Sequence, residues 1–307
     1  MPWMQTAGVP EATHAPGLGE RVTAYIALTK PRIIELLLVT TVPVMVVAQG
    51  GLPRAWLVLA TVVGGAMAAG GANAMNMYVD RDIDARMQRT RNRPLVTGTI
   101  APRDALAFAV SLEVIAFAWL WAFVNPLSAA LAASACLFYV FIYTVWLKRT
   151  SKQNIVIGGA AGAVPVLIGW SSVANSVAWQ PLLLFAVIFF WTPPHFWALA
   201  IKYREDYSAA SVPMLPSVST MRETGIQILA YSSIVVLLGV AFAPVAGMGV
   251  LYLCVAGVAG ALFWWMSLDV LRKGTTQAAM RLFAFSITYL TVLFGAMAAD
   301  VLVRHWA

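Results

Sequence analysis

Three oxygen-bearing side chains recur at four-residue intervals in the first third of the sequence. They are Asn76, Asp80 and Asp84, and positions i, i+4 and i+8 of an α-helix lie on one face. Asp82 falls between them and points away from that face. Mg²⁺ prefers oxygen ligands and is often held by one or two carboxylates together with substrate phosphates. The spacing therefore predicts a magnesium site that works on a phosphate-bearing substrate.

Arginines follow this stripe, and we expect Arg89 and Arg93 to bind the phosphate groups, because guanidinium groups pair well with anionic oxygens. The alternative is a solvated loop with salt bridges at helix ends. Two aspartates on one helix face repel each other by about a few tenths of a kcal/mol when no cation lies near them. Carboxylates close to a membrane interface are also costly unless something holds them there. Both points favour the metal site over the solvated loop.

A second polar segment contains Lys202 and Asp206, again four residues apart. On its own this pair could be an ion pair at the end of a helix. Its place, four predicted helices after the first stripe, suggests an internal repeat with one polar loop in each unit. Two such faces could grip one diphosphate with Mg²⁺ between them. Asp206 is then a candidate catalytic and metal ligand, as are Asn76, Asp80 and Asp84, and Lys202 a candidate phosphate contact.

Two less specific basic positions are Lys148 and Arg149, which follow a long apolar run. They could bind phosphate, or they could be the basic anchors that flank membrane spans on the cytoplasmic side.

One histidine and two acids fall within apolar runs. His195 follows two prolines, 193 and 194, which we expect to break the backbone pattern and line a cavity. A ligand or acid–base role and a buried structural histidine are both open for it. Glu35 and Glu113 are candidate pocket residues, although helix packing would explain them equally well.

The composition identifies the elements that must hold these residues. Of the 307 residues, 61% are hydrophobic and 11% are charged, against about 25% charged in soluble proteins. These values exclude a disordered chain, a nucleic-acid-binding domain and an ordinary soluble enzyme. The net charge of +7 fits basic cytoplasmic loops, so no nucleic-acid partner is expected. Both cysteines lie in apolar runs and predict neither a disulfide nor a metal cluster.

Nine apolar runs are candidates for membrane-spanning helices, which need about 20 residues each. The sequence therefore predicts an all-α polytopic membrane protein, with a cytoplasmic tail over residues 1–30 and a helical domain over 31–304. The predicted spans are 33–50, 55–79, 104–124, 127–147, 154–174, 179–201, 225–246, 249–271 and 280–302.

The basic residues sort by side when these nine spans are drawn. Of the 20 lysines and arginines, 18 fall on the side of the N-terminus, and only Arg54 and Arg304 fall opposite. Cytoplasmic loops of membrane proteins carry such an excess, so the N-terminus is predicted to be cytoplasmic. A transporter would also have many spans and buried acids, but this polar cluster lies at one membrane face instead of the midplane. A structural subunit would leave the aspartate stripe unexplained.

The sequence resembles the UbiA superfamily of intramembrane prenyltransferases over roughly residues 25–300. The aspartate stripe is typical of the superfamily, and the segments around His195 and Asp206 are typical of its haem-modifying branch. Many members have a second aspartate pair where this chain has Lys202 and Asp206, which argues against a quinone-precursor substrate. The segments that carry the resemblance are 28–32, 76–84, 89–95, 143–154, 193–197, 203–207 and 214–216.

The resemblance implies nine helices around a central cavity that faces lipid. It implies a Mg²⁺-dependent enzyme that transfers a farnesyl group from farnesyl diphosphate to a vinyl group of haem b, giving haem O for terminal oxidases. His195 would then contact the haem. A location in the bacterial inner membrane is implied in preference to the mitochondrial one, with contacts to haem A synthase or oxidase assembly proteins. Transfer to an aromatic or quinone precursor is the alternative.

The nine-span topology predicts that the two chain ends lie on opposite sides of the membrane. A reporter fused at Ala7 should indicate a cytoplasmic location, and a reporter fused at Ala307 should indicate a location on the other side of the membrane. Termini on the same side would exclude an odd number of spans.

Overall fold

The computed structural model describes residues 17–306, apart from the side chains of residues 32–38 and 306. Within that range the chain forms helices and turns without a β-strand. The long helices are α1 (Leu18–Thr29), α2 (Pro31–Gln49), α3 (Ala55–Val79), α5 (Pro102–Phe123), α6 (Pro126–Leu137), the π-helix η2 (Phe138–Leu147), α8 (Asn154–Ala174), α9 (Trp179–Lys202), α12 (Met221–Val245), α13 (Val250–Lys273) and α14 (Thr276–Trp306). The short ones are α4 (Arg81–Arg86), α7 (Lys148–Thr150), α10 (Arg204–Ala209) and α11 (Leu215–Val218).

Eight of the described helices are long and apolar enough to cross a membrane. They coincide within a few residues with the second to ninth predicted spans, α6, η2 and α7 together forming one of them. The first predicted span, 33–50, falls in α2. The side chains of residues 32–38 of that helix are not described, so Glu35 lies outside the described part and the count of nine stays a prediction.

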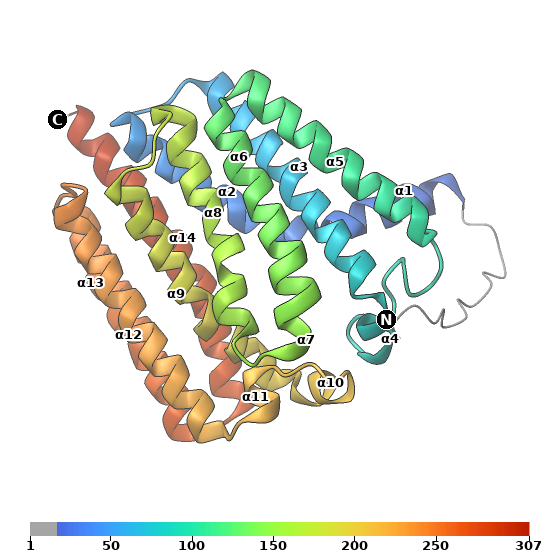
Figure 1. Ribbon diagram of the computed structural model, residues 1–307. Coiled ribbons are helices and arrows are strands. Elements are labelled where there is room, and N and C mark those ends of the chain that lie inside the picture. Colours follow the sequence, from blue (N-terminus) through green and yellow to red (C-terminus); the bar gives the residue numbers. More distant parts are fainter. Residues whose placement is uncertain (1–16, 307) are drawn as a thin grey trace.

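The long helices from α2 to α14 pack into one bundle. Along the chain each one contacts the next, and α14 returns to contact α2 and α9. The short helices α4, α7, α10 and α11 gather at one end of the bundle, opposite the C-terminal end of α14 (Figure 1). The basic loops follow the same helix ends, so this is the end that the charge distribution assigns to the cytoplasm.

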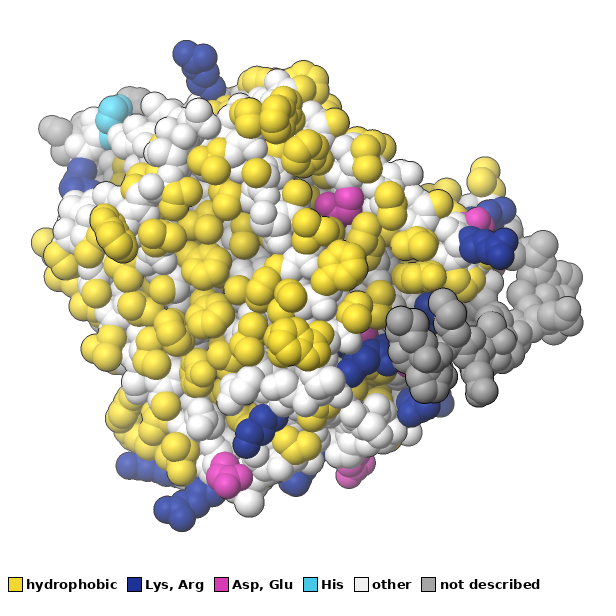
Figure 2. Space-filling model, viewed as in Figure 1, with side chains coloured by type: hydrophobic (Ala, Val, Ile, Leu, Met, Phe, Trp, Pro, Cys, Tyr) yellow, Lys and Arg dark blue, Asp and Glu magenta, His cyan; other side chains and the backbone are white. Residues whose placement is uncertain are grey.

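Hydrophobic side chains cover the side of the bundle. Figure 2 shows them spread over the long helices, with lysines and arginines mostly toward the end that carries the short helices. Exposed apolar residues include Leu237 and Val258, at 69% and 65% exposure. Such a belt of exposed apolar side chains fits a lipid environment.

Glycines allow some of the helices to pack closely, as small residues do in membrane bundles. A Cβ atom at Gly169 of α8 would lie 2.7 Å from the backbone carbonyl oxygen of Thr41 in α2. One at Gly159 would lie 3.0 Å from Thr192 of α9. Helices α2, α8 and α9 thus approach each other at glycines where a larger side chain would not fit.

Two local expectations were wrong. The Asn76–Asp84 segment is not one continuous helix, because α3 ends at Val79 and Asp80 is in a turn before α4. The prolines at 193 and 194 lie inside α9, which continues through them from Trp179 to Lys202. Neighbouring helices can compensate a proline within a membrane span, which is the physical reason that the break does not occur.

The close approach at Gly169 predicts a specific loss of stability. We expect Gly169→Ala to lower the free energy of unfolding by about 1–3 kcal/mol, because the added methyl group meets a backbone atom that cannot rotate away. Gly162→Ala on the same helix is the matched control, since no atom lies within 4 Å of its Cβ position. Thermal unfolding in detergent measures both variants. Equal melting temperatures would contradict the proposed contact.

Candidate active site

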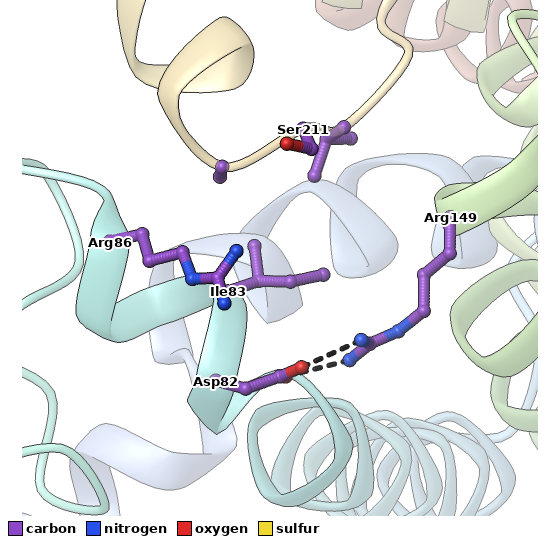
Figure 3. Close-up of a pocket in the computed structure, with 7 residues that line it drawn as sticks. Asp82, Ile83, Arg86, Arg149 and Ser211 are labelled. Carbon is purple, nitrogen blue, oxygen red and sulfur yellow. Dashed lines mark hydrogen bonds and ion pairs between the residues drawn. The ribbon is translucent and has the colours of Figure 1, made fainter. Parts of the chain in front are cut away.

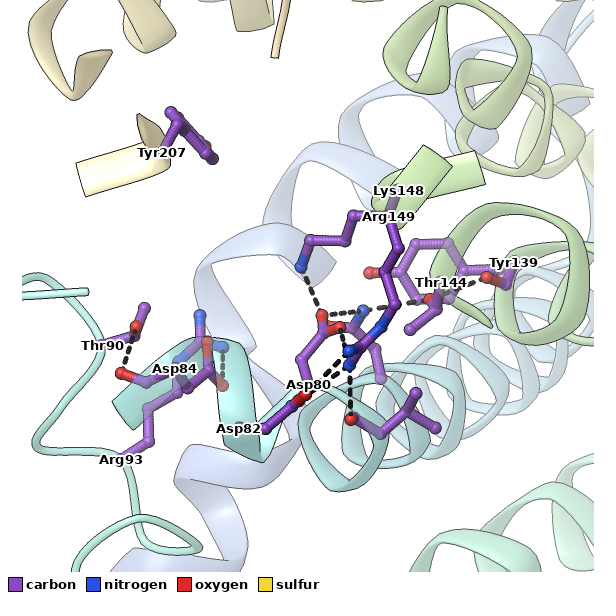
Figure 4. Close-up of polar contacts among 12 residues, drawn as sticks. Asp80, Asp82, Asp84, Thr90, Arg93, Tyr139, Thr144, Lys148, Arg149 and Tyr207 are labelled. Carbon is purple, nitrogen blue, oxygen red and sulfur yellow. Dashed lines mark hydrogen bonds and ion pairs between the residues drawn. The ribbon is translucent and has the colours of Figure 1, made fainter. Parts of the chain in front are cut away.

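Asp80 is the centre of a buried polar cluster at the cytoplasmic end of α3. Its side chain is fully buried, and its Oδ2 atom accepts hydrogen bonds from the Lys148 ammonium group and, at 2.8 Å, from the Asn76 amide (Figure 4). Its Oδ1 atom accepts no hydrogen bond, and the Arg149 guanidinium group lies 3.8 Å from it. A buried carboxylate oxygen without a donor is costly, so Asp80 retains an unused acceptor.

Asn76 is fixed by three partners from three segments. Its amide nitrogen donates to Asp80 and to Thr144 Oγ1, at 3.0 Å, and its oxygen accepts from the Lys30 ammonium group at 2.9 Å. Thr144 belongs to η2, where its hydroxyl donates to the Tyr139 carbonyl at 2.8 Å. π-Helical turns are rare and often occur at functional sites.

Lys30 is a member of this cluster that sequence spacing did not identify. It lies between α1 and α2 with φ of 52°, in the left-handed region, and α2 begins directly after it with Pro31. Burial lowers the pKa of Lys30 to about 7, and the neighbouring positive charges of Arg93 and Lys148 act in the same direction. Lys30 is 46 residues from Asn76, so no local pattern could have joined them.

Asp84 lies in α4, one turn after Asp80, and is buried. Its carboxylate forms an ion pair with Arg93 at 2.6 Å. Burial raises the pKa of Asp84 above its usual value, although Arg93 opposes that shift. The hydroxyl of Thr90 donates to the Asp84 backbone carbonyl at 3.0 Å and ties the following loop to α4. The predicted arginine loop is thereby folded back onto the aspartate stripe.

Asp82 lies on another side of α4, as the sequence predicted. It is 56% exposed and forms two hydrogen bonds of 2.7 Å with the Arg149 guanidinium group (Figure 3). Partial burial disfavours its ionised form, but the Arg149 pair outweighs this and keeps the pKa of Asp82 below its usual value. Arg149 also donates to the Val79 carbonyl at 3.1 Å, so it connects Asp82 with the buried Asp80.

The second polar segment meets the first through Arg89. Asp206 accepts from the Arg89 backbone N–H at 3.4 Å, and Tyr207 accepts from the Arg89 guanidinium group at 3.3 Å. That guanidinium carbon also lies 5.0 Å from the centre of the Tyr203 ring. The two loops therefore join across the bundle, but no contact within the described residues connects Asp206 with Asp80 or Asp84.

Lys202 and Asp206 do not form the helix-end ion pair that their spacing allowed. The reason is that α9 ends at Lys202 and α10 begins at Arg204, so they are not on one helix. The exposed Lys202 ammonium group lies 5.5 Å from the centre of the Tyr203 ring, and its remaining hydrogen-bonding capacity is open to an anion.

Glu113 and His195, the acid and the histidine of the apolar runs whose side chains are described, lie apart from this cluster. His195 is buried in α9, where its Nδ1 atom is 2.7 Å from Ser286 Oγ and its ring stacks between Trp191 and Phe283. Glu113 of α5 lies against Gly71 of α3. The packing of His195 resembles that of a structural histidine, and no described contact joins it to the aspartates.

The donor set suits a hard cation that a substrate helps to hold. No three acidic, histidine or cysteine side chains in the described part of the chain come close enough to form a metal site alone. Mg²⁺ does not require such a set, because substrate phosphates supply further ligands. Asp80 has one buried oxygen without a donor, and the Lys148 ammonium group balances the charge of its other oxygen.

Comparison with known proteins identifies the family of this chain. The family model described as the UbiA prenyltransferase family matches residues 37–292. The chain belongs to the UbiA prenyltransferase family. It is 53% identical over 289 residues to the protoheme IX farnesyltransferase of Leifsonia xyli subsp. xyli, with 93% of this chain and 94% of the relative covered. It is 48% identical over 307 residues to that of Streptomyces coelicolor, covering 97% and 98%.

Solved structures share the fold of this UbiA-family protein at low sequence identity. One from a study of digeranylgeranylglyceryl phosphate synthase has a TM-score of 0.76 and 16% identity, covering 92% of this chain and 99% of that one. A UbiA homologue from Archaeoglobus fulgidus bound to GPP and Mg²⁺ has a TM-score of 0.61 and 16% identity, covering 89% and 99%. The chain is thus a polytopic membrane protein with the prenyltransferase fold.

The buried Lys148–Asp80 pair gives a test of cation binding that does not depend on turnover. Lys148→Met should lower stability by about 3–5 kcal/mol in metal-free buffer, because it leaves Asp80 buried without its main countercharge. Added Mg²⁺ should then raise the melting temperature of this variant more than that of the wild type, since a bound cation replaces the lost charge. The exposed Lys152→Met is the control. An Mg²⁺ response no larger than the control's would argue against a metal at Asp80.

Proposed function

We propose that this protein transfers a farnesyl group from farnesyl diphosphate to a vinyl group of haem b, with addition of water, and so produces haem O. Relatives about half identical over nearly the whole chain are named protoheme IX farnesyltransferase. The observation that carries the proposal is the buried Asp80, with Lys148 and Arg149 around it, at the cytoplasmic end of an apolar bundle. A diphosphate with an apolar chain needs adjoining polar and apolar environments of this kind.

Positive side chains from different segments would hold the diphosphate. Lys148 and Arg149 come from the end of one span, and Arg93 from the loop that folds onto α4. Arg89 and Lys202 lie where the two polar loops meet. Each of them would stabilise the negative charge that develops as the allylic carbon–oxygen bond breaks and the diphosphate leaves.

Asn76, Asp80 and Asp84 would hold Mg²⁺ together with the diphosphate, and Asp206 would complete the site from the second loop. The bound ion would supply Lewis-acid stabilisation of the leaving group, which is worth several kcal/mol in such sites. The Archaeoglobus fulgidus homologue, which has the same fold, was solved with GPP and Mg²⁺ bound. That structure supports the choice of Mg²⁺ here.

The acceptor would react from the apolar side of the cluster. The haem vinyl carbon forms the new bond to the farnesyl carbon that has lost diphosphate, and water adds to the resulting cation as a proton is released. The protein's part is to hold donor and acceptor together and to keep water from the first cation. We assign His195 to the haem, because it is the one histidine in a predicted span, and place it deeper along α9 than Lys202.

The proposal includes the setting of the enzyme. We place it in the bacterial inner membrane, with its N-terminal 30 residues in the cytoplasm, a catalytic domain over 31–304 and a lipid-facing cavity in the bundle. Haem A synthase or oxidase assembly proteins are candidate partners, since haem O is poorly soluble. A quinone precursor as acceptor is the competing proposal. The product formed from each acceptor distinguishes the two.

Purified protein incubated with farnesyl diphosphate, haem b and Mg²⁺ should yield haem O, detected by mass, and chelation of Mg²⁺ should stop the reaction. Asp80→Asn and Asp84→Asn should each lower kcat by about 100-fold or more, because several kcal/mol of leaving-group stabilisation is lost. Asp82→Asn should lower it less than about tenfold, since Asp82 lies on another side of α4. Equal losses in the three variants would refute the role of the stripe, and prenylation of an aromatic acid alone would refute the haem acceptor.

A further inference from the structure

A small pocket lies at the cytoplasmic end, beside the aspartate cluster. Its volume is about 200 Å³, and it is lined by Asp82, Ile83 and Arg86 of α4, Arg149, and residues 210–212. Pockets that take up whole ligands are larger, roughly 300–1,000 Å³. This one has room for a short arm of a larger molecule.

Arg86 supplies an unused positive charge in this pocket. Its side chain extends from α4 into the space below the Ser211 segment, and Arg149 faces it from the other side (Figure 3). Arg149 is already paired with Asp82 by two hydrogen bonds. In the described part of the chain, no hydrogen bond or ion pair involves the guanidinium group of Arg86, so it is available to an anion.

The other walls of the pocket combine one hydroxyl with apolar side chains. Ser211 has φ of 55°, a left-handed conformation that is uncommon for residues other than glycine, and it lines the pocket opposite Arg86. Ile83 and Val212 are buried beneath. A cation, a hydroxyl and an apolar floor suit a carboxylate at the end of a short aliphatic arm.

We infer that Arg86 and Ser211 bind a carboxylate of the acceptor and so determine which amphipathic molecules can be prenylated. The inference rests on the proposed function, in which the acceptor is haem b, a large apolar ring with two carboxylate arms at one edge. These carboxylates remain at the aqueous face of the bundle. Arg149 links the pocket to the donor site, since it contacts both Asp82 and Asp80. An acceptor anchored here stands beside the diphosphate cluster.

The dimethyl ester of haem b provides the test, because it has the same ring and vinyl groups but no carboxylate. Arg86→Ala should raise the apparent KM for haem b about tenfold or more, through loss of a charge-assisted hydrogen bond. It should leave the KM for the ester and for farnesyl diphosphate unchanged. Arg86→Lys should recover part of the loss as a point charge. The exposed Arg91→Ala in the loop after α4 is the control.

Three results would overturn the inference. They are an equal effect of Arg86→Ala on haem b and its ester, no effect on either, or a raised KM for farnesyl diphosphate, which would make the pocket part of the diphosphate site. A wild-type protein that forms no haem O would defeat the proposed function. Absorbance titration of haem b and the ester into wild type and Arg86→Ala, without donor, would then still decide whether the pocket binds a carboxylate.

Discussion

The buried carboxylate of Asp80 is the constraint on which the cytoplasmic end of this protein depends. An ionised group without solvent needs countercharge from its surroundings, and here Lys148 and Arg149 come from a segment almost 70 residues away in the sequence. Asn76 extends the cluster to Lys30 and Thr144. Because Asp80 pairs with Asn76 of α3 and with α7, and Asn76 pairs with η2 and the α1–α2 junction, these elements must meet at a single place.

The apolar bundle makes that meeting possible. In a membrane, apolar side chains gain little hydrophobic free energy by packing against another helix instead of lipid. Close contacts at glycines, such as that of Gly169 with Thr41, therefore set how closely the helices approach. The polar loops then join at one end, where the Arg89 guanidinium group lies close to the rings of Tyr203 and Tyr207. Charge at one end and apolar surface along the sides provide the two environments that a prenyl diphosphate and its acceptor need.

Helix positions were predictable from the sequence, but several contacts of the site were not. Apolar runs of about 20 residues mark membrane spans because lipid tolerates little else, and α3 and α8 begin and end where those runs do. The stripe at Asn76, Asp80 and Asp84 was visible from local spacing. Lys30 was not assigned to the site, because its pairing with Asn76 depends on how distant helices pack. Thr144 is one turn before Lys148, and that spacing was an available signal.

The π-helical turns of η2 have a consequence for how this site can change. Each residue that a wider turn adds rotates the rest of the helix by about 100° relative to a regular α-helix. Lys148 follows η2 directly, and so the direction of its ammonium group depends on the number of residues from Phe138 to Leu147. A deletion of one residue between Thr144 and Lys148 would change the direction of the lysine relative to Asp80 and leave every polar residue of the cluster in the sequence. The length of this apolar segment therefore matters to the geometry of the site, as do the identities of its polar residues.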